Sequence, residues 1–167
     1  EPDDRFILGN AFNEGIRKIE QFDLVYDILI YERQLAPSIE FVDLHPNLSF
    51  VLDHVAKPRI GDGVMDPWKE QMFEMARREN VTCKLSGMAT EANWKEWTLD
   101  GLRPYMEVAL DAFGPNRLMF GSDWPVARLA VDYGPWVSLC REFISTLSPH
   151  EREAIEGGNA IRAYRLD

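Results

Sequence analysis

The chain carries four short apolar segments that are typical of β-strands. They are rich in branched and aromatic residues, are bounded by turn-forming or charged residues, and cover residues 22–31, 48–55, 81–85 and 117–122. Their first residues are 26, 33 and 36 positions apart. A strand, a crossover helix and the next parallel strand need about 30 residues. The spacing therefore predicts a parallel β/α array.

The segments between these strands have the apolar spacing of amphipathic helices. Apolar residues recur every three or four positions over residues 12–19, 68–76, 102–113 and 136–147. The third pattern stops at Gly114-Pro115, the fourth follows Pro135, and Asp66 is a candidate N-cap for the second. We expect the aromatic and methionine side chains of these helices to pack in the core and not to hold a cofactor.

Three connections follow the predicted carboxyl ends of strands, at residues 57–66, 88–99 and 124–134. In a β/α barrel such connections build the active site, whereas the opposite connections only close the fold. By this rule His45, which leads into a strand, is predicted to be a surface residue on the non-catalytic side. His150, at the start of a helix, is predicted to be capping or solvated.

Composition limits the classes of function. A chain of 167 residues with 46 % hydrophobic content predicts one globular α/β domain over residues 1–167. The apolar runs are too short for a membrane helix and no signal peptide opens the sequence, so we expect a cytoplasmic protein. A net charge of -10 argues against a nucleic-acid partner. Cys83 and Cys140 are expected to be small buried side chains, because their spacing suits neither a disulfide framework nor a metal site.

His54 and Asp123 are the main candidates for chemistry, because each stands where a predicted strand ends. A carboxylate facing a metal or a substrate carbonyl can take a proton from water and make it a nucleophile. The alternatives are a hydrogen-bonded core histidine at His54 and a turn-capping role for Asp123.

Other residues are weaker candidates. Lys84 is expected to bind a substrate carboxylate or carbonyl, or else to be solvated. The loop tryptophans, Trp94, Trp97 and Trp124, could wall an apolar or sugar-stacking pocket or pack within their loops. The motifs of serine esterases, P-loop NTPases and dinucleotide-binding folds do not occur, so a triad of Ser86 or Ser122 with His54 and Asp123 is a weak alternative.

Four segments, residues 51–58, 84–87, 113–125 and 158–166, resemble a branch of the amidohydrolase superfamily. That branch contains sugar-lactone hydrolases and the pyrone dicarboxylate lactonase. The resemblance implies a TIM-type (β/α)8 barrel in which the four predicted strands are the fifth to eighth. Since a whole barrel has about 250 residues, the chain is expected to be its C-terminal half. The start at Glu1, without an initiator methionine, agrees with this expectation of a fragment.

The resemblance also implies a hydrolase that opens the lactone of a sugar acid or a related cyclic ester. Asp123 matches the family's general base, and His54 matches a histidine that polarises the carbonyl or binds metal. The resemblance thus implies that both are ligands of one divalent ion, zinc or manganese, although some relatives work without a metal. Tyr31 is a further candidate for substrate contact, beside Lys84 and Trp124. The family's first-strand His-x-His pair is absent from the sequence.

Two alternatives to a lactonase remain at this stage. One is a decarboxylase of the same superfamily, which would use the same carbonyl-polarising groups. The other is a non-catalytic half-barrel that acts as an assembly unit. Because four βα units leave open sheet edges, we expect either a homo-oligomer or association with a missing N-terminal half.

Overall fold

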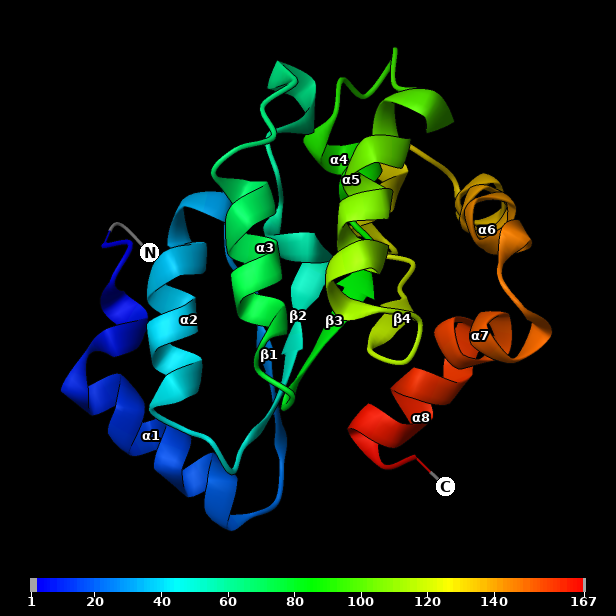
Figure 1. Ribbon diagram of the computed structural model, residues 1–167. Coiled ribbons are helices and arrows are strands. Elements are labelled where there is room, and N and C mark those ends of the chain that lie inside the picture. Colours follow the sequence, from blue (N-terminus) through cyan, green and yellow to red (C-terminus); the bar gives the residue numbers. More distant parts are fainter. Residues whose placement is uncertain (1–2, 167) are drawn as a thin grey trace.

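A four-stranded parallel sheet forms the centre of the computed structural model, which describes residues 3–166 (Figure 1). Its strands pair in the order of the chain and are β1 (Val25–Ile28), β2 (Ser49–Leu52), β3 (Val81–Leu85) and β4 (Leu118–Phe120). Every neighbouring pair is parallel. The predicted α/β array is therefore confirmed, although β1, β2 and β4 are shorter than the apolar segments that predicted them.

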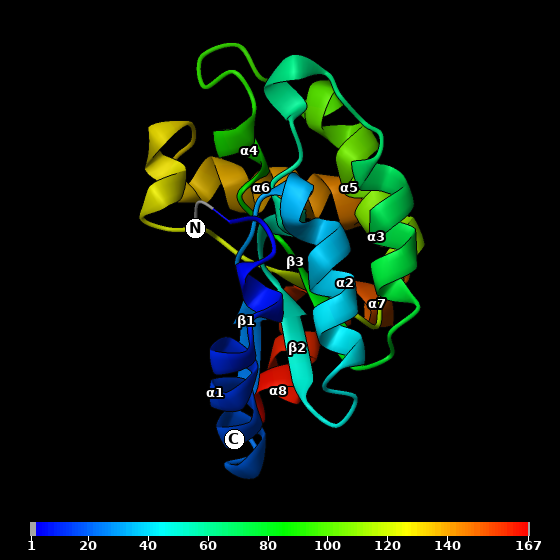
Figure 2. The ribbon, with the colours of Figure 1, turned by 90° about the vertical axis from the view of Figure 1, so that its left-hand side faces the viewer.

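Eight α-helices are assigned within residues 3–166. They are α1 (Asn10–Gln21), α2 (Leu35–Asp43), α3 (Trp68–Ala76), α4 (Met88–Glu91), α5 (Leu99–Phe113), α6 (Tyr133–Phe143), α7 (Pro149–Glu153) and α8 (Asn159–Tyr164). Helices α2, α3 and α5 lie side by side over one face of the sheet (Figures 1 and 2). In this part of the chain, no helix combines the length and the apolar character needed to cross a membrane.

The four predicted amphipathic helices are confirmed as α1, α3, α5 and α6. Two details differ from the expectations. Pro67, and not Asp66, is the N-cap of α3, and no side chain caps this helix. Helix α2 was not predicted, because its buried residues surround most of the helix and leave no clear polar stripe: Leu35, Pro37, Ser38, Ile39, Phe41 and Val42.

The two faces of the sheet have different chemistry. Along β3, Val81, Cys83 and Leu85 are fully buried, whereas Lys84 points to the opposite face. A polar cluster surrounds Lys84, whose Nζ lies 2.7 Å from Asp27 Oδ2 and 2.7 Å from Asp53 Oδ1. The Tyr164 hydroxyl on α8 donates to the same Asp27 carboxylate at 2.8 Å. This cluster joins β1, β3, the end of β2 and the last helix.

The charge of Lys84 is stabilised within the cluster. Burial lowers the pKa of Lys84, but hydrogen bonds to Asp27 and Asp53 outweigh this effect and raise the pKa above its ordinary value. Lys84 therefore stays protonated and paired with carboxylates. It is not the solvated lysine that was one of the two alternatives for this position.

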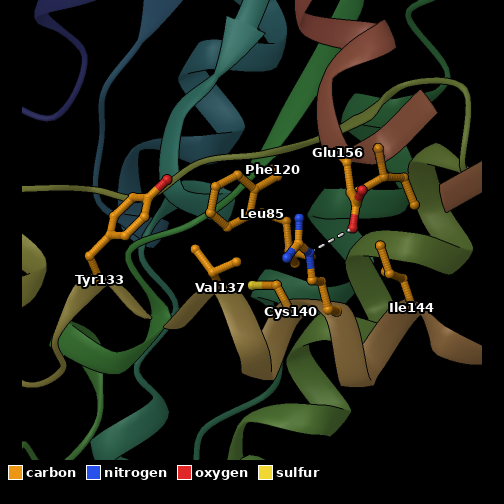
Figure 3. Close-up of a pocket in the computed structure, with 9 residues that line it drawn as sticks. Leu85, Phe120, Tyr133, Val137, Cys140, Ile144 and Glu156 are labelled. Carbon is orange, nitrogen blue, oxygen red and sulfur yellow. Dashed lines mark hydrogen bonds and ion pairs between the residues drawn. The ribbon is translucent and has the colours of Figure 1, made fainter. Parts of the chain in front are cut away.

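Both cysteines are buried, as expected, and burial raises the pKa of Cys140 to about 12. Cys140 lines a cavity of about 240 Å³ between α6 and the strands, together with Leu85, Phe120, Val137 and Ile144 (Figure 3). Arg141 and Glu156 also line this cavity, and Arg141 Nε lies 3.0 Å from Glu156 Oε1 (dashed line in Figure 3). The cavity contains none of the predicted site residues.

His45 corrects the sequence prediction in one respect. It precedes β2, on the non-catalytic side as predicted, but it is only 2 % exposed and the prediction of a surface residue is wrong. Its Nε2 atom is 2.7 Å from Asn13 Oδ1 on α1, and its ring packs against Phe41. His150, in contrast, is exposed at the start of α7, as predicted.

The burial of His45 predicts a loss of stability in mildly acidic solution. Burial lowers the pKa of the folded histidine, whereas the unfolded chain has the ordinary value of about 6.5. As the pH falls below about 6.5, the unfolded state binds the proton first, and the free energy of unfolding should decrease; above that pH this contribution is complete. Urea unfolding at about pH 7.5 and about pH 5 measures the effect.

The variant His45→Gln isolates this contribution, because it removes the titrating group and keeps a hydrogen-bonding side chain. We expect its free energy of unfolding to depend less on pH than that of the wild-type protein. His150→Gln is the matched control and should behave like the wild type, since His150 is exposed. An identical pH dependence in His45→Gln and wild type would contradict the assignment.

Candidate active site

His54 and Asp123 meet at the carboxyl edge of the sheet, as their positions predict. His54 follows β2 and Asp123 follows β4, and the two side chains approach each other across the end of β3. His54 Nε2 lies 3.5 Å from Asp123 Oδ1, and the side chains are 16 % and 12 % exposed. The pair is therefore largely enclosed, with a small part of each side chain exposed.

Ser86, directly after β3, fixes the other side of the histidine ring. Its hydroxyl Oγ lies 2.7 Å from His54 Nδ1. Burial lowers the pKa of His54, although the carboxylates of Asp123 and Asp53 act in the opposite direction. Ser86 is completely buried, so a substrate cannot reach its hydroxyl. This geometry argues against a triad with Ser86 as the nucleophile and assigns Ser86 to orienting the ring. The Ser122 hydroxyl accepts from the backbone N–H of Trp124 at 3.2 Å.

Two glycines make room for this arrangement. A Cβ atom on Gly87 would lie 2.7 Å from His54 Cβ, and Gly87 has a φ of +67°. A Cβ atom on Gly121 would lie 2.9 Å from Ser86 Cβ. Because real Cβ atoms do not approach so closely, the ring of His54 and the hydroxyl of Ser86 keep their places only with glycine at both positions.

His54 begins a left-handed turn of four residues. The φ angles of His54, Val55, Ala56 and Lys57 are 52°, 46°, 58° and 49°. Such angles cost about 1–2 kcal/mol per residue, and a branched residue such as Val55 rarely adopts them. The turn is held by complete burial of Val55 and Ala56 and by the Trp68 indole, which donates to the Val55 carbonyl at 2.7 Å. The predicted strand over residues 48–55 therefore ends early, at Leu52.

Asp123 is held in a similar way. Its φ is 53°, and its carbonyl oxygen accepts from the backbone N–H of Ala127 at 2.8 Å. The indole of buried Trp136 on α6 donates to the Gly121 carbonyl at 2.8 Å. Each catalytic candidate is thus anchored by a tryptophan from the helix that follows its strand.

The three predicted substrate contacts have different surroundings. Lys84 is paired with Asp27 and Asp53, and its charge is one of those that lower the pKa of His54. Tyr31 is exposed after β1, and its ring lies 5.2 Å from the Nζ atom of Lys57. Trp124 is exposed beside Asp123.

The two other loop tryptophans donate to carbonyl oxygens of the loops. The Trp94 indole donates to Thr90 and the Trp97 indole to Ala130, at 2.8 and 3.1 Å. These contacts favour the loop-packing interpretation for both residues. Through this hydrogen bond, Trp97 links the loop after β3 to the loop after β4.

Sequence reasoning missed two charged residues at this edge. Lys57 Nζ lies 3.7 Å from Glu91 Oε1. Burial raises the pKa of Glu91, while the nearby Lys57 acts to lower it. Helix α4, which carries Glu91, packs against the 3₁₀ turns at 60–62 and 126–129, so the three predicted site loops converge here. Lys57 could have been found from its place three residues after His54, but no local signal marks Glu91.

The predicted metal ligands form only part of a metal site. Two donors of one tetrahedral zinc ion lie about 3.3 Å apart, which agrees with the 3.5 Å between His54 and Asp123. A catalytic zinc site has about three protein ligands. Within residues 3–166, no group of three or more histidine, cysteine or acidic side chains is placed to hold a metal ion. The described residues therefore do not complete such a site by themselves.

A pair of glycine variants tests how His54 is positioned. Gly87→Ala and Gly63→Ala have the same backbone cost, because the φ values are +67° and +66°, but nothing lies within 4 Å of a Cβ at Gly63. We expect both to lose about 1 kcal/mol of unfolding free energy from the left-handed backbone. Only Gly87→Ala should lose more, and only it should impair catalysis, because its methyl group displaces His54. Equal effects of both variants on stability and activity would contradict the role of Gly87.

The chain is similar in sequence to proteins named as sugar lactonases. The chain is 41 % identical to the L-fucono-1,5-lactonase of Burkholderia multivorans over 99 % of its own length and 60 % of that protein. It is 26 % identical to the L-rhamnono-gamma-lactonase of Scheffersomyces stipitis over 80 % of its length and 45 % of that protein. The chain thus spans at most about three fifths of these relatives.

A solved structure provides the same match in three dimensions. It is an amidohydrolase from Burkholderia multivorans with bound zinc, with a TM-score of 0.94 and 40 % identity over 98 % of this chain and 60 % of that one. A family model described as amidohydrolase matches residues 1–166. The chain therefore belongs to the amidohydrolase family, in the branch that contains the sugar lactonases.

Proposed function

We propose that the protein hydrolyses the lactone of a sugar acid. The observation that carries the proposal is the contact between His54 Nε2 and Asp123 Oδ1, 3.5 Å apart at the carboxyl edge of the sheet. This histidine and carboxylate stand in a chain about 40 % identical to proteins named L-fucono-1,5-lactonase, which supports the reaction class. Because the chain spans only about 60 % of those relatives, the activity of the whole protein is part of the proposal.

In the proposed mechanism, Asp123 acts as the general base. Its carboxylate takes a proton from a water molecule, whose oxygen attacks the lactone carbonyl carbon. The tetrahedral intermediate then collapses and the bond between the former carbonyl carbon and the ring oxygen breaks. The leaving ring oxygen receives the proton that Asp123 carries. The net change is the addition of one water across the ester, which gives a hydroxy acid.

His54 binds the carbonyl oxygen in this mechanism. We assign the Ser86 hydroxyl as the donor to Nδ1, 2.7 Å away, which places the hydrogen of the neutral ring on Nε2. That Nε2–H can then donate to the lactone oxygen as negative charge develops there. The lowered pKa of His54 favours this neutral donor form of the ring.

We further propose that the exposed rings of Tyr31 and Trp124 contact the sugar part of the lactone, since Tyr31 follows β1 and Trp124 follows Asp123 after β4, at the same edge of the sheet. Lys84 acts indirectly, because its charge is already paired with two carboxylates. The proposed mechanism uses only protein side chains, because His54 and Asp123 alone do not complete a metal site. The zinc ion belongs to the Burkholderia multivorans structure.

The sheet itself requires partners in this proposal. Strands β1 and β4 form its two edges, and a closed eight-stranded barrel needs four further βα units. We propose that these units come from additional polypeptide or from a second copy of this chain. Intact mass and size-exclusion chromatography of the native protein distinguish the two sources.

Replacing Asp123 by Asn tests the general base. We expect the turnover of L-fucono-1,5-lactone to fall by about 100-fold or more, because the amide cannot accept the proton from water. Stability should change little, since asparagine tolerates the φ of 53° at this position. Acid release followed with a pH indicator measures the rate, and urea unfolding measures the stability.

Asp132→Asn is the matched control. Asp132 follows the same strand, but its side chain is 80 % exposed and is paired only loosely with Arg128. We expect this variant to retain the wild-type rate. Wild-type turnover in Asp123→Asn would remove Asp123 from the mechanism.

A further inference from the structure

Two charged side chains next to the His54–Asp123 pair take no part in the hydrolysis described above. Lys57 ends the left-handed turn that begins at His54, and Glu91 lies on α4 after β3. Their side chains are 26 % and 22 % exposed. Both are therefore mostly enclosed, which is unusual for charged residues without strong partners.

The two side chains form a long ion pair. Lys57 Nζ and Glu91 Oε1 are 3.7 Å apart, whereas Lys84 lies 2.7 Å from each of its two carboxylates. The pKa of Glu91 remains raised by burial despite the nearby lysine. The pair is thus less well compensated than the Lys84 cluster. An oxygen atom about 2.8 Å from each group can bridge this gap with two hydrogen bonds.

A hollow lies on the Lys57 side of the pair. Lys57 Nζ lies 5.2 Å from the centre of the Tyr31 ring, and the Arg33 guanidinium lies 4.9 Å from it. Tyr31 and Lys57 line a hollow of about 340 Å³, together with Phe6, Leu29, Ile30 and Gln34, and Glu91 is not among its lining residues. This volume is within the range of ligand pockets, about 300–1,000 Å³. On the other side, Glu91 is close enough to Asp123 for their charges to interact.

The chemistry of the pair selects among ligand classes. An ammonium group only donates hydrogen bonds and a carboxylate only accepts them, so together they match a hydroxyl group, which does both. A ligand carboxylate at this point would be repelled by Glu91 and Asp123. An apolar ligand would cover both charges without satisfying them. A hydroxylated ring satisfies both groups, and an aromatic face such as that of Tyr31 can cover its carbon atoms.

We propose that Lys57 and Glu91 form a hydroxyl-binding subsite that recognises the sugar part of the lactone. Lys57 donates to a ring hydroxyl and Glu91 accepts from one, while the carbonyl lies between His54 and Asp123. This inference rests on the proposed lactone hydrolysis. The two residues therefore set the preference for hydroxylated lactones over unsubstituted ones.

The test compares two lactones in the complete protein. L-fucono-1,5-lactone carries hydroxyl groups and δ-valerolactone carries none. The readout is the ratio of kcat/KM for the first to kcat/KM for the second. We expect this ratio to fall at least about tenfold in Lys57→Met and in Glu91→Met, mainly through a higher KM for the hydroxylated lactone, because the hydrogen bonds to its hydroxyls are lost.

Matched controls exist on α3. Lys69→Met and Glu70→Met make the same changes at exposed positions away from the site and should leave the ratio unchanged. If a methionine variant at the subsite does not fold, Lys57→Arg and Glu91→Asp replace it. These variants keep the charge but move it, so a smaller fall of the ratio in the same direction is expected.

The outcomes separate this inference from the proposed function. If the wild-type protein hydrolyses L-fucono-1,5-lactone but the subsite variants lose activity on both lactones equally, or keep the wild-type ratio, the hydroxyl subsite is overturned and lactone hydrolysis stands. If the wild-type protein hydrolyses neither lactone, the proposed function fails and the subsite fails with it.

Discussion

Parallel pairing of the strands in chain order is the constraint on which the rest of the structure depends. Each strand must be followed by a crossover before the next one begins, so all carboxyl ends lie at one edge of the sheet. His54, Ser86 and Asp123 come from three successive strands and meet there. The same pairing sends Lys84 and Asp27 to the face opposite the buried side chains of β3, where they neutralise each other.

The strained backbone at the strand ends persists because buried tryptophans of the following helices stabilise it. His54 and Asp123 both have a positive φ, so the direction of each side chain differs from the one it would have if the strand continued. Trp68 and Trp136 hold these two exits by donating to backbone carbonyls. The aromatic residues of the helices thus do more than fill the core.

Much of the fold was predictable, because burial leaves a periodic trace in the sequence. The spacing of apolar segments predicted the parallel array, and the ends of two strands pointed to His54 and Asp123. The apolar pattern could not predict features that depend on residues distant in the sequence. The burial of His45 requires Asn13, 32 residues earlier, and the pairing of Lys84 requires Asp27, 57 residues earlier. The position of Glu91 near the site could not be predicted, because it depends on the packing of α4 beside the left-handed turn that ends at Lys57.

The contact between Tyr164 and Asp27 has a consequence for the order of folding. The two residues are 137 positions apart, and their hydrogen bond links the last helix to the first strand. Closing a loop of that length costs more chain entropy than closing the connections of about 30 residues between neighbouring strands, so the neighbouring strand pairs form first. We expect this contact to be absent from the folding transition state, and its loss to speed unfolding more than it slows folding. The last helix thus slows the unfolding of a sheet that has formed before the helix docks.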